Sequence, residues 1–460
     1  MINYFLKFSG HYKAILKLGI PIVIGQLGIV FLAFADNIMI GQYNTLDLAA
    51  ASFVNNTYNL PILFGLGFSY ALTPIVGQLF GRKDYSKVGE TLKNSLLLNF
   101  LMSILIATFM FIFWLNIDSM GQPVEILSLI KKYYMIQLFS IPFIMLFNSF
   151  KQFGDGITKT KISMYIMLSA NLLNVVLNYI FIYGKLGFPE MGVIGAGIAT
   201  FISRIMMLVL FIIIFIKSKD LSVYKEGFIN GKLNKSCIRV LNKMGWMIGI
   251  QMGLETGLFT ISSIFVGWFG SVSLAAHQIV VTVSTLGFMV YYGIGAAVAV
   301  RVSNFYGQND LKNVRSTTFA GFHITLCLAI IASTFFILTR NVIGDIFTNS
   351  QEVKDLTSSL MIILLFYQFG DPLQITFANA LRGINDVSRM MVLAFIGYML
   401  VALPTCYFLG ITLGYGVQGI WLGYPVGLTT AGILFYLRFN KKTKMTTAKP
   451  KSKYNKNTDN

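Results

Sequence analysis

The chain has 460 residues, of which 55% are hydrophobic and only 12% are charged, and its formal net charge at pH 7 is +18. Because a soluble domain is about 25% charged, this composition excludes an ordinary soluble protein and predicts a chain that is solvated mostly by lipid. The excess of Lys and Arg lies in short loops between apolar runs. There it sets membrane topology and meets anionic lipid, which argues against nucleic acid as a partner.

Apolar runs long enough to cross a bilayer recur along the chain and predict an all-α membrane protein with twelve spanning helices. Met1–Lys17 has no small-residue cleavage site, so we interpret it as an uncleaved, amphipathic lead-in to the first span. Pro21, Pro142, Pro372 and Pro404 lie inside spans and should kink them. The predicted spans are 15–41, 48–80, 91–116, 126–152, 161–184, 192–217, 240–268, 274–305, 313–339, 353–381, 389–410 and 417–439.

The charge of the loops alternates along the chain and sets the predicted topology. Connections that follow even-numbered spans are rich in Lys and Arg, whereas the other connections have less net positive charge. By the positive-inside rule, both termini are cytoplasmic and the number of spans is even. We therefore expect an N-terminal lobe at 1–217, a cytoplasmic loop at 218–239, a C-terminal lobe at 240–440 and a disordered basic tail at 441–460.

The second half of the chain repeats the first at an offset of about 226 residues. The matched positions include Gly41 with Gly267, Gly81 with Gly307, Asp84 with Asp310, and Gly192 with Gly416. Six spans per half is an even number, so both halves insert in the same direction and are related by an axis along the membrane normal. Two such six-helix lobes, related by pseudo-two-fold symmetry, favour a transporter that works by rocking over a channel or an enzyme.

Three acidic residues lie inside predicted spans: Asp36, Glu255 and Asp371. An acid at the bilayer centre costs about 2.5–3.5 kcal/mol, so each needs a partner or a purpose. None has a cation nearby in its own helix. The plain alternative is that each is merely held by hydrogen bonds between helices. An uncompensated carboxylate instead exchanges protons near neutral pH, or binds a metal ion or an organic cation, and this mutual exclusion is what an antiporter needs.

Polar and aromatic residues suggest surroundings for these acids. Asn174 and Asn178 are four residues apart and share a helix face, which suits either interhelical bonding or a role beside Asp36. Tyr367 lies one turn from Asp371, so a ring and a carboxylate would face a flat cation together. The other aromatic candidates, which equally suit packing, are Phe259, Phe288, Tyr291 and Tyr292.

Motifs for catalysis are missing from the sequence. The three histidines are scattered without metal-ligand spacing, the three cysteines form no close pair, and there is no Walker motif. We therefore expect neither an enzyme nor a bound cofactor. An ion gradient of Na+ or H+ is the expected source of energy.

Several motifs in both halves resemble the multidrug and toxic compound extrusion (MATE) family, and within it the NorM-like branch. The resemblance covers about residues 10 to 440. It rests on Phe34-Ala35-Asp36-Asn37, Pro74-Ile-Val-Gly-Gln78, Ala275-Ala276-His277-Gln278, Gln368-Phe-Gly-Asp371 and Leu381-Arg382-Gly383. The resemblance implies two six-helix lobes in a V shape.

The same resemblance implies a division of roles between the lobes. Asp36 with Asn174 and Asn178 would form a proton or cation site in the N-terminal lobe. Glu255, Asp371 and Tyr367 would form a cation site in the C-terminal lobe, with Na+ bound at the two acids. Gln278 is a further candidate for substrate contact, and either Tyr291 or Tyr292 would stack on the substrate. Asp36 aligns with Ser262, so the lobes are not chemically equivalent.

The function expected from these features is export of small hydrophobic organic cations, such as dyes and fluoroquinolone-like drugs, by antiport with Na+ or H+. We expect a monomer in the lipid bilayer. The main alternative is a flippase for lipids or lipid-linked oligosaccharides of related fold, which would need a wider basic cavity. A membrane-bound transferase would need a polar catalytic loop, and a passive channel would not need isolated acids at two depths.

Overall fold

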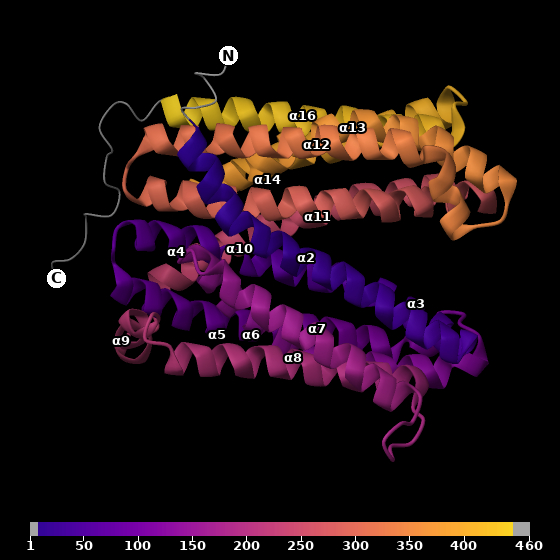
Figure 1. The fold of residues 1–460 in the computed structure, drawn as a ribbon, viewed down its shortest axis with the longest axis horizontal. Coiled ribbons are helices and arrows are strands. Elements are labelled where there is room, and N and C mark those ends of the chain that lie inside the picture. The colour runs from indigo at the N-terminus through magenta and orange to yellow at the C-terminus, as the bar shows by residue number, and fades with distance from the viewer. Residues whose placement is uncertain (1–7, 445–460) are drawn as a thin grey trace.

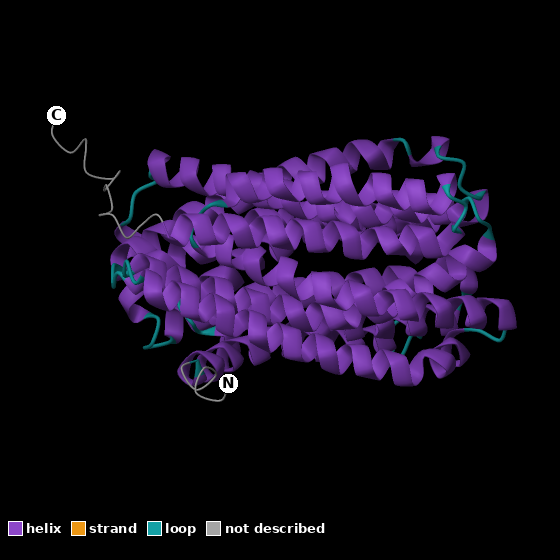
Figure 2. Cartoon of the chain, turned by 90° about the horizontal axis from the view of Figure 1, so that it is seen from above, coloured by secondary structure: helices purple, strands orange, loops and turns teal. Residues whose placement is uncertain are grey.

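The computed structural model describes residues 8–444, and every regular element in that range is helical. Twelve helices are long and apolar enough to span a membrane, as predicted. In Figure 2 these helices run side by side, and the loops gather at the two ends. The elements are α2 (Ser9–Tyr43), α3 (Thr45–Ser69), α4 (Leu72–Gly81), α5 (Tyr85–Leu115), η1 (Ile117–Ser119), α6 (Val124–Gly156), α7 (Thr160–Ile182), α8 (Gly192–Lys217), α9 (Ser222–Asn230), α10 (Lys235–Gly267), α11 (Ser271–Gly307), α12 (Leu311–Phe347), α13 (Gln351–Gly383), α14 (Val387–Phe395), η2 (Ile396–Ala402), α15 (Leu403–Tyr407), η3 (Phe408–Thr412) and α16 (Gly416–Lys444).

Most spans extend a few residues beyond their predicted limits, because helices continue past the hydrocarbon layer into polar caps. Asn44 caps α3 through its side chain, which accepts a hydrogen bond from the Leu46 amide at 2.8 Å. The lead-in is partly helix, since α2 begins at Ser9. The eleventh span contains two π-helical segments, η2 and η3, on either side of the short α15 with its Pro404.

The segment between the lobes is not the open loop predicted at 218–239. It contains the helix α9, and α10 already begins at Lys235. Gly227 of α9 lies so close to α5 that a Cβ there would come within 1.9 Å of the Ser86 carbonyl oxygen. This approach anchors α9 to the first lobe. Residues 441–444 form the last turn of α16, and the rest of the predicted tail lies outside the described residues.

Two bundles make up the molecule, one from each half of the chain (Figure 1). Buried apolar side chains of α10–α16 form most of one core, which the start of α2 joins through Ile15, Leu18 and Ile22. Those of α3–α8 form most of two adjoining cores in the other half. Helices whose apolar residues cover their whole circumference can pack on one side and face lipid on the other. The fold is therefore the pair of six-helix lobes that was predicted.

The first helix of each lobe begins against the other lobe. Gly19 of α2 packs on Ile294 of α11, whereas Gly28, further along α2, packs on Asn171 of α7. Figure 1 shows α2 crossing diagonally from one bundle to the other. The early part of α10 behaves in the same way, since Gly245 packs on Phe68 of α3. These exchanged helices tie the lobes together.

Glycine contacts between α4 and α11 close the lobes together at one end. A Cβ at Gly81 would lie 2.1 Å from the Asn304 carbonyl oxygen, and one at Gly307 would lie 2.2 Å from the Gln78 carbonyl oxygen. Arg82 Nε donates to the Gly307 oxygen at 3.2 Å, and Gln78 Nε2 donates to the Gly383 oxygen at 3.0 Å. The two glycine contacts are copies of each other at an offset of 226 residues, so a pseudo-two-fold axis passes between them.

The backbone repeats the same symmetry in its turns. Lys83 and Asn309, which are 226 residues apart, both have φ of 61°, and this left-handed conformation is uncommon for residues other than glycine. Asp84 and Asp310 follow them and cap the next helices. The predicted internal repeat is confirmed in the conformation of individual residues.

Candidate functional site

Asp36 in α2 lies against a row of polar side chains from α7 and α8. Asn178 Nδ2 donates to Asp36 Oδ1 at 2.5 Å and lies 3.0 Å from Asn174 Oδ1. Asn174 Nδ2 in turn lies 3.3 Å from the Thr200 hydroxyl. Both asparagines are fully buried, whereas Asp36 is half-buried. The fold thus brings the predicted N-lobe residues together, because the four-residue spacing sets both amides on one face of α7.

Arg204 of α8 is a further charged residue near this acid. Its guanidinium donates to the Tyr58 hydroxyl at 2.6 Å and to Gln137 Oε1 at 3.0 Å, and it also bonds Ser140. It attracts Asp36 electrostatically without forming an ion pair within 4 Å. Arg204 is not among the residues predicted from the sequence, although a cation inside an apolar span is itself a signal of function.

Asp371 is the most secluded carboxylate of the C-terminal lobe. It lies in α13, is 1% exposed, and neither carboxylate oxygen has a hydrogen-bond partner among the described residues. Pro372 follows it, and α13 continues through both residues. Leaving a buried acceptor without a donor costs about 1–3 kcal/mol or more, so this position is expensive to maintain. A group in this state is suited to bind a proton or a cation.

Glu255 of α10 lies close to Asp371 but in a different polar setting. Its carboxylate accepts hydrogen bonds from Gln251 Nε2 at 3.2 Å and from Gln374 Nε2 at 3.3 Å. The two acids repel each other electrostatically. Gln251 also accepts from Arg382 at 2.5 Å, so this amide bridges Glu255 to a cation from α13. Glu255 is isolated in its own helix, as the sequence indicated, but not in the folded lobe.

Two of the predicted aromatic residues, Tyr367 and Tyr291, lie near the C-lobe acids, and a third, Phe259, packs on Tyr367. Tyr367 is 5% exposed, and its ring lies 6.5 Å from that of Phe259 between centroids. Tyr291 is buried, donates from its hydroxyl to Gln368 Oε1 at 2.6 Å and interacts electrostatically with Asp371. Of the two adjacent tyrosines, Tyr291 is therefore the one that lies beside the acids.

The remaining candidates lie elsewhere. Tyr292 points toward the other lobe, where its ring lies 6.1 Å from that of Tyr70, and Phe288 stacks on it at 5.9 Å. Gln278 is exposed on α11. Ser262, the counterpart of Asp36, bonds the Tyr424 hydroxyl at 2.6 Å, so the second lobe fills that position with a neutral pair.

Two symmetric helical lobes that carry buried acids define a multi-pass membrane protein of the transporter class. The MatE family model matches residues 21–180 and 248–408. The chain belongs to this family of multidrug efflux transporters, as the resemblance indicated.

Curated relatives and solved structures match nearly the full length of the chain. The multidrug resistance protein NorM of Vibrio cholerae is 33% identical over 435 residues, 93% of this chain and 95% of that protein. NorM of Photobacterium profundum is 30% identical over 93% of this chain and 94% of that protein. Among structures, an outward-facing multidrug resistance MATE transporter of the MOP superfamily has a TM-score of 0.87 at 20% identity, with 95% and 96% coverage. A MOP transporter from Pyrococcus furiosus has a TM-score of 0.86 at 19% identity, with 94% and 96% coverage. At these identities, the similarity to the two solved structures shows a shared fold.

Proposed function

We propose that this protein exports hydrophobic organic cations by antiport with H+ or Na+. The observation that carries the proposal is Asp371, a fully buried carboxylate that lies near a second acid and whose two oxygens have no hydrogen-bond partner among residues 8–444. Two neighbouring carboxylates in hydrocarbon cannot both keep their charge without a cation between them. An incoming ion and an outgoing cation therefore compete for the same negative charge.

The aromatic residues give this site its selectivity for large, flat cations. Tyr291 of α11 and Tyr367 of α13 interact electrostatically with Asp371, and Phe259 of α10 packs on Tyr367. Faces of aromatic rings attract organic cations by about 0.5–2 kcal/mol each, and they do so without specific hydrogen bonds. A site of this kind accepts many cations that share shape and charge rather than one substrate.

The coupling ion reaches the same carboxylates. A proton neutralises Asp371 directly, whereas Na+ requires several oxygen ligands. Glu255 and Asp371 offer such oxygens, as does the hydroxyl of Tyr398, a buried residue of η2 that accepts a hydrogen bond from Gln374 and interacts electrostatically with both acids. Full reversal of a two-state equilibrium requires about 5.5 kcal/mol of differential binding. Neutralising the buried acids, with Asp36 as a further site in the other lobe, supplies free energy of that order.

Charge distribution supports the orientation and the location of the protein. The helices α2 and α16 begin and end at the same end of the molecule, together with the Lys- and Arg-rich connections (Figure 1). By the positive-inside rule this end faces the cytoplasm of a bacterial cell, across its inner membrane. We propose that the chain acts there as a monomer.

The decisive experiment compares Asp371→Asn with a matched control, Asp345→Asn. Asp345 is exposed at the end of α12 and pairs with Lys354 at 2.7 Å. Purified proteins in liposomes receive a proton gradient or a sodium gradient separately, and ethidium transport is followed by fluorescence. We expect Asp371→Asn to lose at least about 90% of gradient-driven transport and Asp345→Asn to retain it. Wild-type transport by Asp371→Asn would refute the proposal.

A further inference from the structure

A small cavity separate from both acid sites lies between the lobes, near the end that α4 and α11 close. Its volume is about 30 Å³. About 10–15 Å³ of such space holds one water molecule, so the cavity has room for about two waters or one halide-sized ion. The lining residues are Ile22, Tyr70, Thr73, Pro74, Lys151, Gln152, Asp155, Tyr292, Ala296, Ala299, Val300, Asn379 and Arg382.

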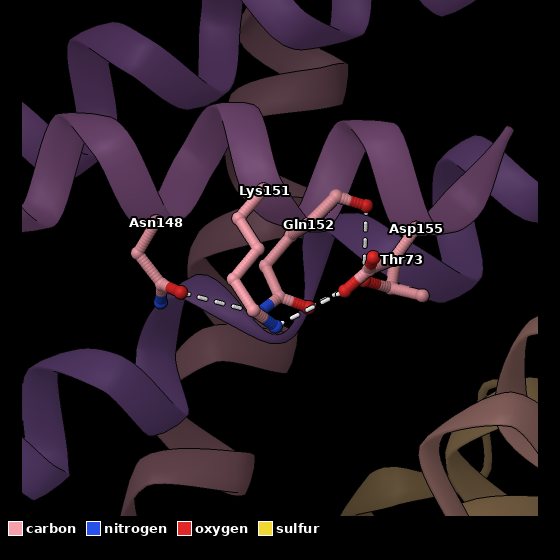
Figure 3. A network of polar contacts seen from close by, with 5 residues as sticks. All are labelled: Thr73, Asn148, Lys151, Gln152 and Asp155. Carbon is pink, nitrogen blue, oxygen red and sulfur yellow. Dashed lines mark hydrogen bonds and ion pairs between the residues drawn. The ribbon is translucent and has the colours of Figure 1, made fainter. Parts of the chain in front are cut away.

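The N-lobe wall of this cavity is a buried ion pair on α6. Lys151 Nζ lies 3.1 Å from Asp155 Oδ2, and the two side chains are only 12% and 5% exposed. Figure 3 shows the pair beside Gln152, which bonds the Thr73 hydroxyl at 2.6 Å and Asn148 Oδ1 at 3.3 Å. This network fixes α6 against α4. Lys151 directs one ammonium proton at Asp155, which leaves two for another acceptor as far as residues 8–444 are concerned.

The C-lobe wall contributes a second cation, Arg382 of α13. Arg382 is 7% exposed, and within the described residues its hydrogen-bond partners are neutral groups, the oxygen of Gln251 and the hydroxyl of Tyr292. Its Nε donor has no partner there. Tyr292 interacts with both Arg382 and Tyr70, which places phenol groups beside the guanidinium. Lys151, Asp155 and Arg382 together give the lining a net charge of +1.

We propose that this cavity binds a small monovalent anion of halide size between Lys151 and Arg382. A buried guanidinium needs either a counter-ion or a full set of acceptors, because an unpaired buried charge is strongly destabilising. Asp155 already pairs with Lys151, whereas Arg382 has no acid within 4 Å among the described residues. An anion would complete the hydrogen bonds of Arg382 and join two lobes that must later separate.

The bridge through Gln251 links this anion site to the C-lobe acids. Gln251 contacts Arg382 on one side and Glu255 on the other, so Glu255 supplies distant compensation for Arg382. Removing the negative charge of Glu255 should therefore strengthen anion binding. If the proposed function holds, the coupling ion and the anion then bind cooperatively. The coupling ion neutralises Glu255, so that the positive charge of Arg382 attracts the anion more strongly.

Thermal unfolding of the purified protein tests anion binding without any transport measurement. Chloride and gluconate are titrated as their sodium salts, so that the cation is the same in both series. Gluconate has the same charge as chloride but is too large for the cavity. We expect chloride to raise Tm by about 1–2 °C at tenfold excess over Kd and to keep raising it with the logarithm of its concentration, and gluconate to have no such effect. Equal responses to the two salts would overturn the proposal.

Variants locate the effect. Arg382→Gln should abolish the difference between chloride and gluconate. Arg301→Gln, which replaces a half-buried arginine outside the cavity lining, should retain that difference. If Arg382→Gln does not fold, the double variant Lys151→Gln with Asp155→Asn provides the test instead. It removes the ion pair of the other wall with little change in side-chain size and should weaken chloride binding. Glu255→Gln should tighten chloride binding by roughly tenfold. If the wild-type protein shows no chloride-specific rise in Tm but still shows Asp371-dependent transport, the anion site is rejected and the proposed function stands.

Discussion

A single methyl group at Gly81 should loosen the closed end of the molecule. In Gly81→Ala, the new Cβ would lie 2.1 Å from the Asn304 carbonyl oxygen and 2.9 Å from its carbonyl carbon. Ordinary contact begins at 3.4 Å, so α4 and α11 must separate by about 1.3 Å (3.4 minus 2.1). The obstacle is backbone rather than a flexible side chain, so a rotamer change cannot relieve it.

The magnitude follows from the hydrogen bonds that this separation breaks. Gln78 donates to Gly383 at 3.0 Å and Arg82 donates to Gly307 at 3.2 Å, and an extra 1.3 Å ends both interactions. A neutral hydrogen bond contributes about 0.5–1.5 kcal/mol, and one with a charged donor about 1.5–3 kcal/mol. The closed end is therefore destabilised by at least about 2 kcal/mol. This changes the ratio of closed to open populations roughly 30-fold.

Distances between spin labels on the two lobes measure this shift. Ser86→Cys and Lys312→Cys provide two exposed sites at equivalent places in the two halves. Pulsed electron resonance on the labelled protein should show a longer distance component that grows in Gly81→Ala. Gly253→Ala is the matched control, because a Cβ at Gly253 meets nothing within 4 Å. The reasoning is wrong if the folded Gly81→Ala protein gives the same distance distribution as wild type.

Three further predictions concern the sites and the core. Asn178→Leu removes the 2.5 Å donor to Asp36 and should lower ethidium transport at least about tenfold, whereas Asn116→Leu, at an exposed helix end, should not. Arg204→Gln removes the cation nearest to Asp36 and should shift the pH at which transport is half-maximal, a change that a merely structural role would not produce. Phe211→Ala, at a fully buried position, should destabilise the N-terminal lobe by about 3–5 kcal/mol in reversible unfolding, while the lipid-facing change Phe109→Ala should cost less than about 1 kcal/mol.

The spans and the repeat could be predicted because the bilayer leaves few alternatives. Every backbone group in hydrocarbon must bond within its own segment, so apolar length alone defines the helices. The matched glycines and aspartates predicted the repeat, and the equal φ of Lys83 and Asn309 between them shows it in the backbone. The pairing of Asn174 and Asn178 followed from helical spacing in the same way.

Contacts between distant segments could not be predicted from the same patterns. Arg382 and Gln251 are 131 positions apart, and no local rule places a guanidinium of α13 beside an amide of α10. The helix α9 was missed because its apolar residues are few, and its order depends on the close approach of Gly227 to α5. Tyr291 and Tyr292 differ only in their direction around α11, and packing alone distinguishes them.

The two lobes differ in a way that reflects two different requirements. Under the proposed antiport, rocking requires a closed end that separates evenly, and the repeat preserves it in the paired contacts of Gly81 and Gly307. The proposed coupling requires that ion binding act differently on the two lobes, and here the repeat has been lost: Asp36 provides a carboxyl group, whereas Ser262 forms a neutral bond with Tyr424. A symmetric set of acids would give both lobes equal affinity for every ion. A ligand shifts a conformational equilibrium only if it binds the two conformations with different affinities. Lobes with different acids therefore allow the ion and the substrate to favour different conformations of the proposed transporter.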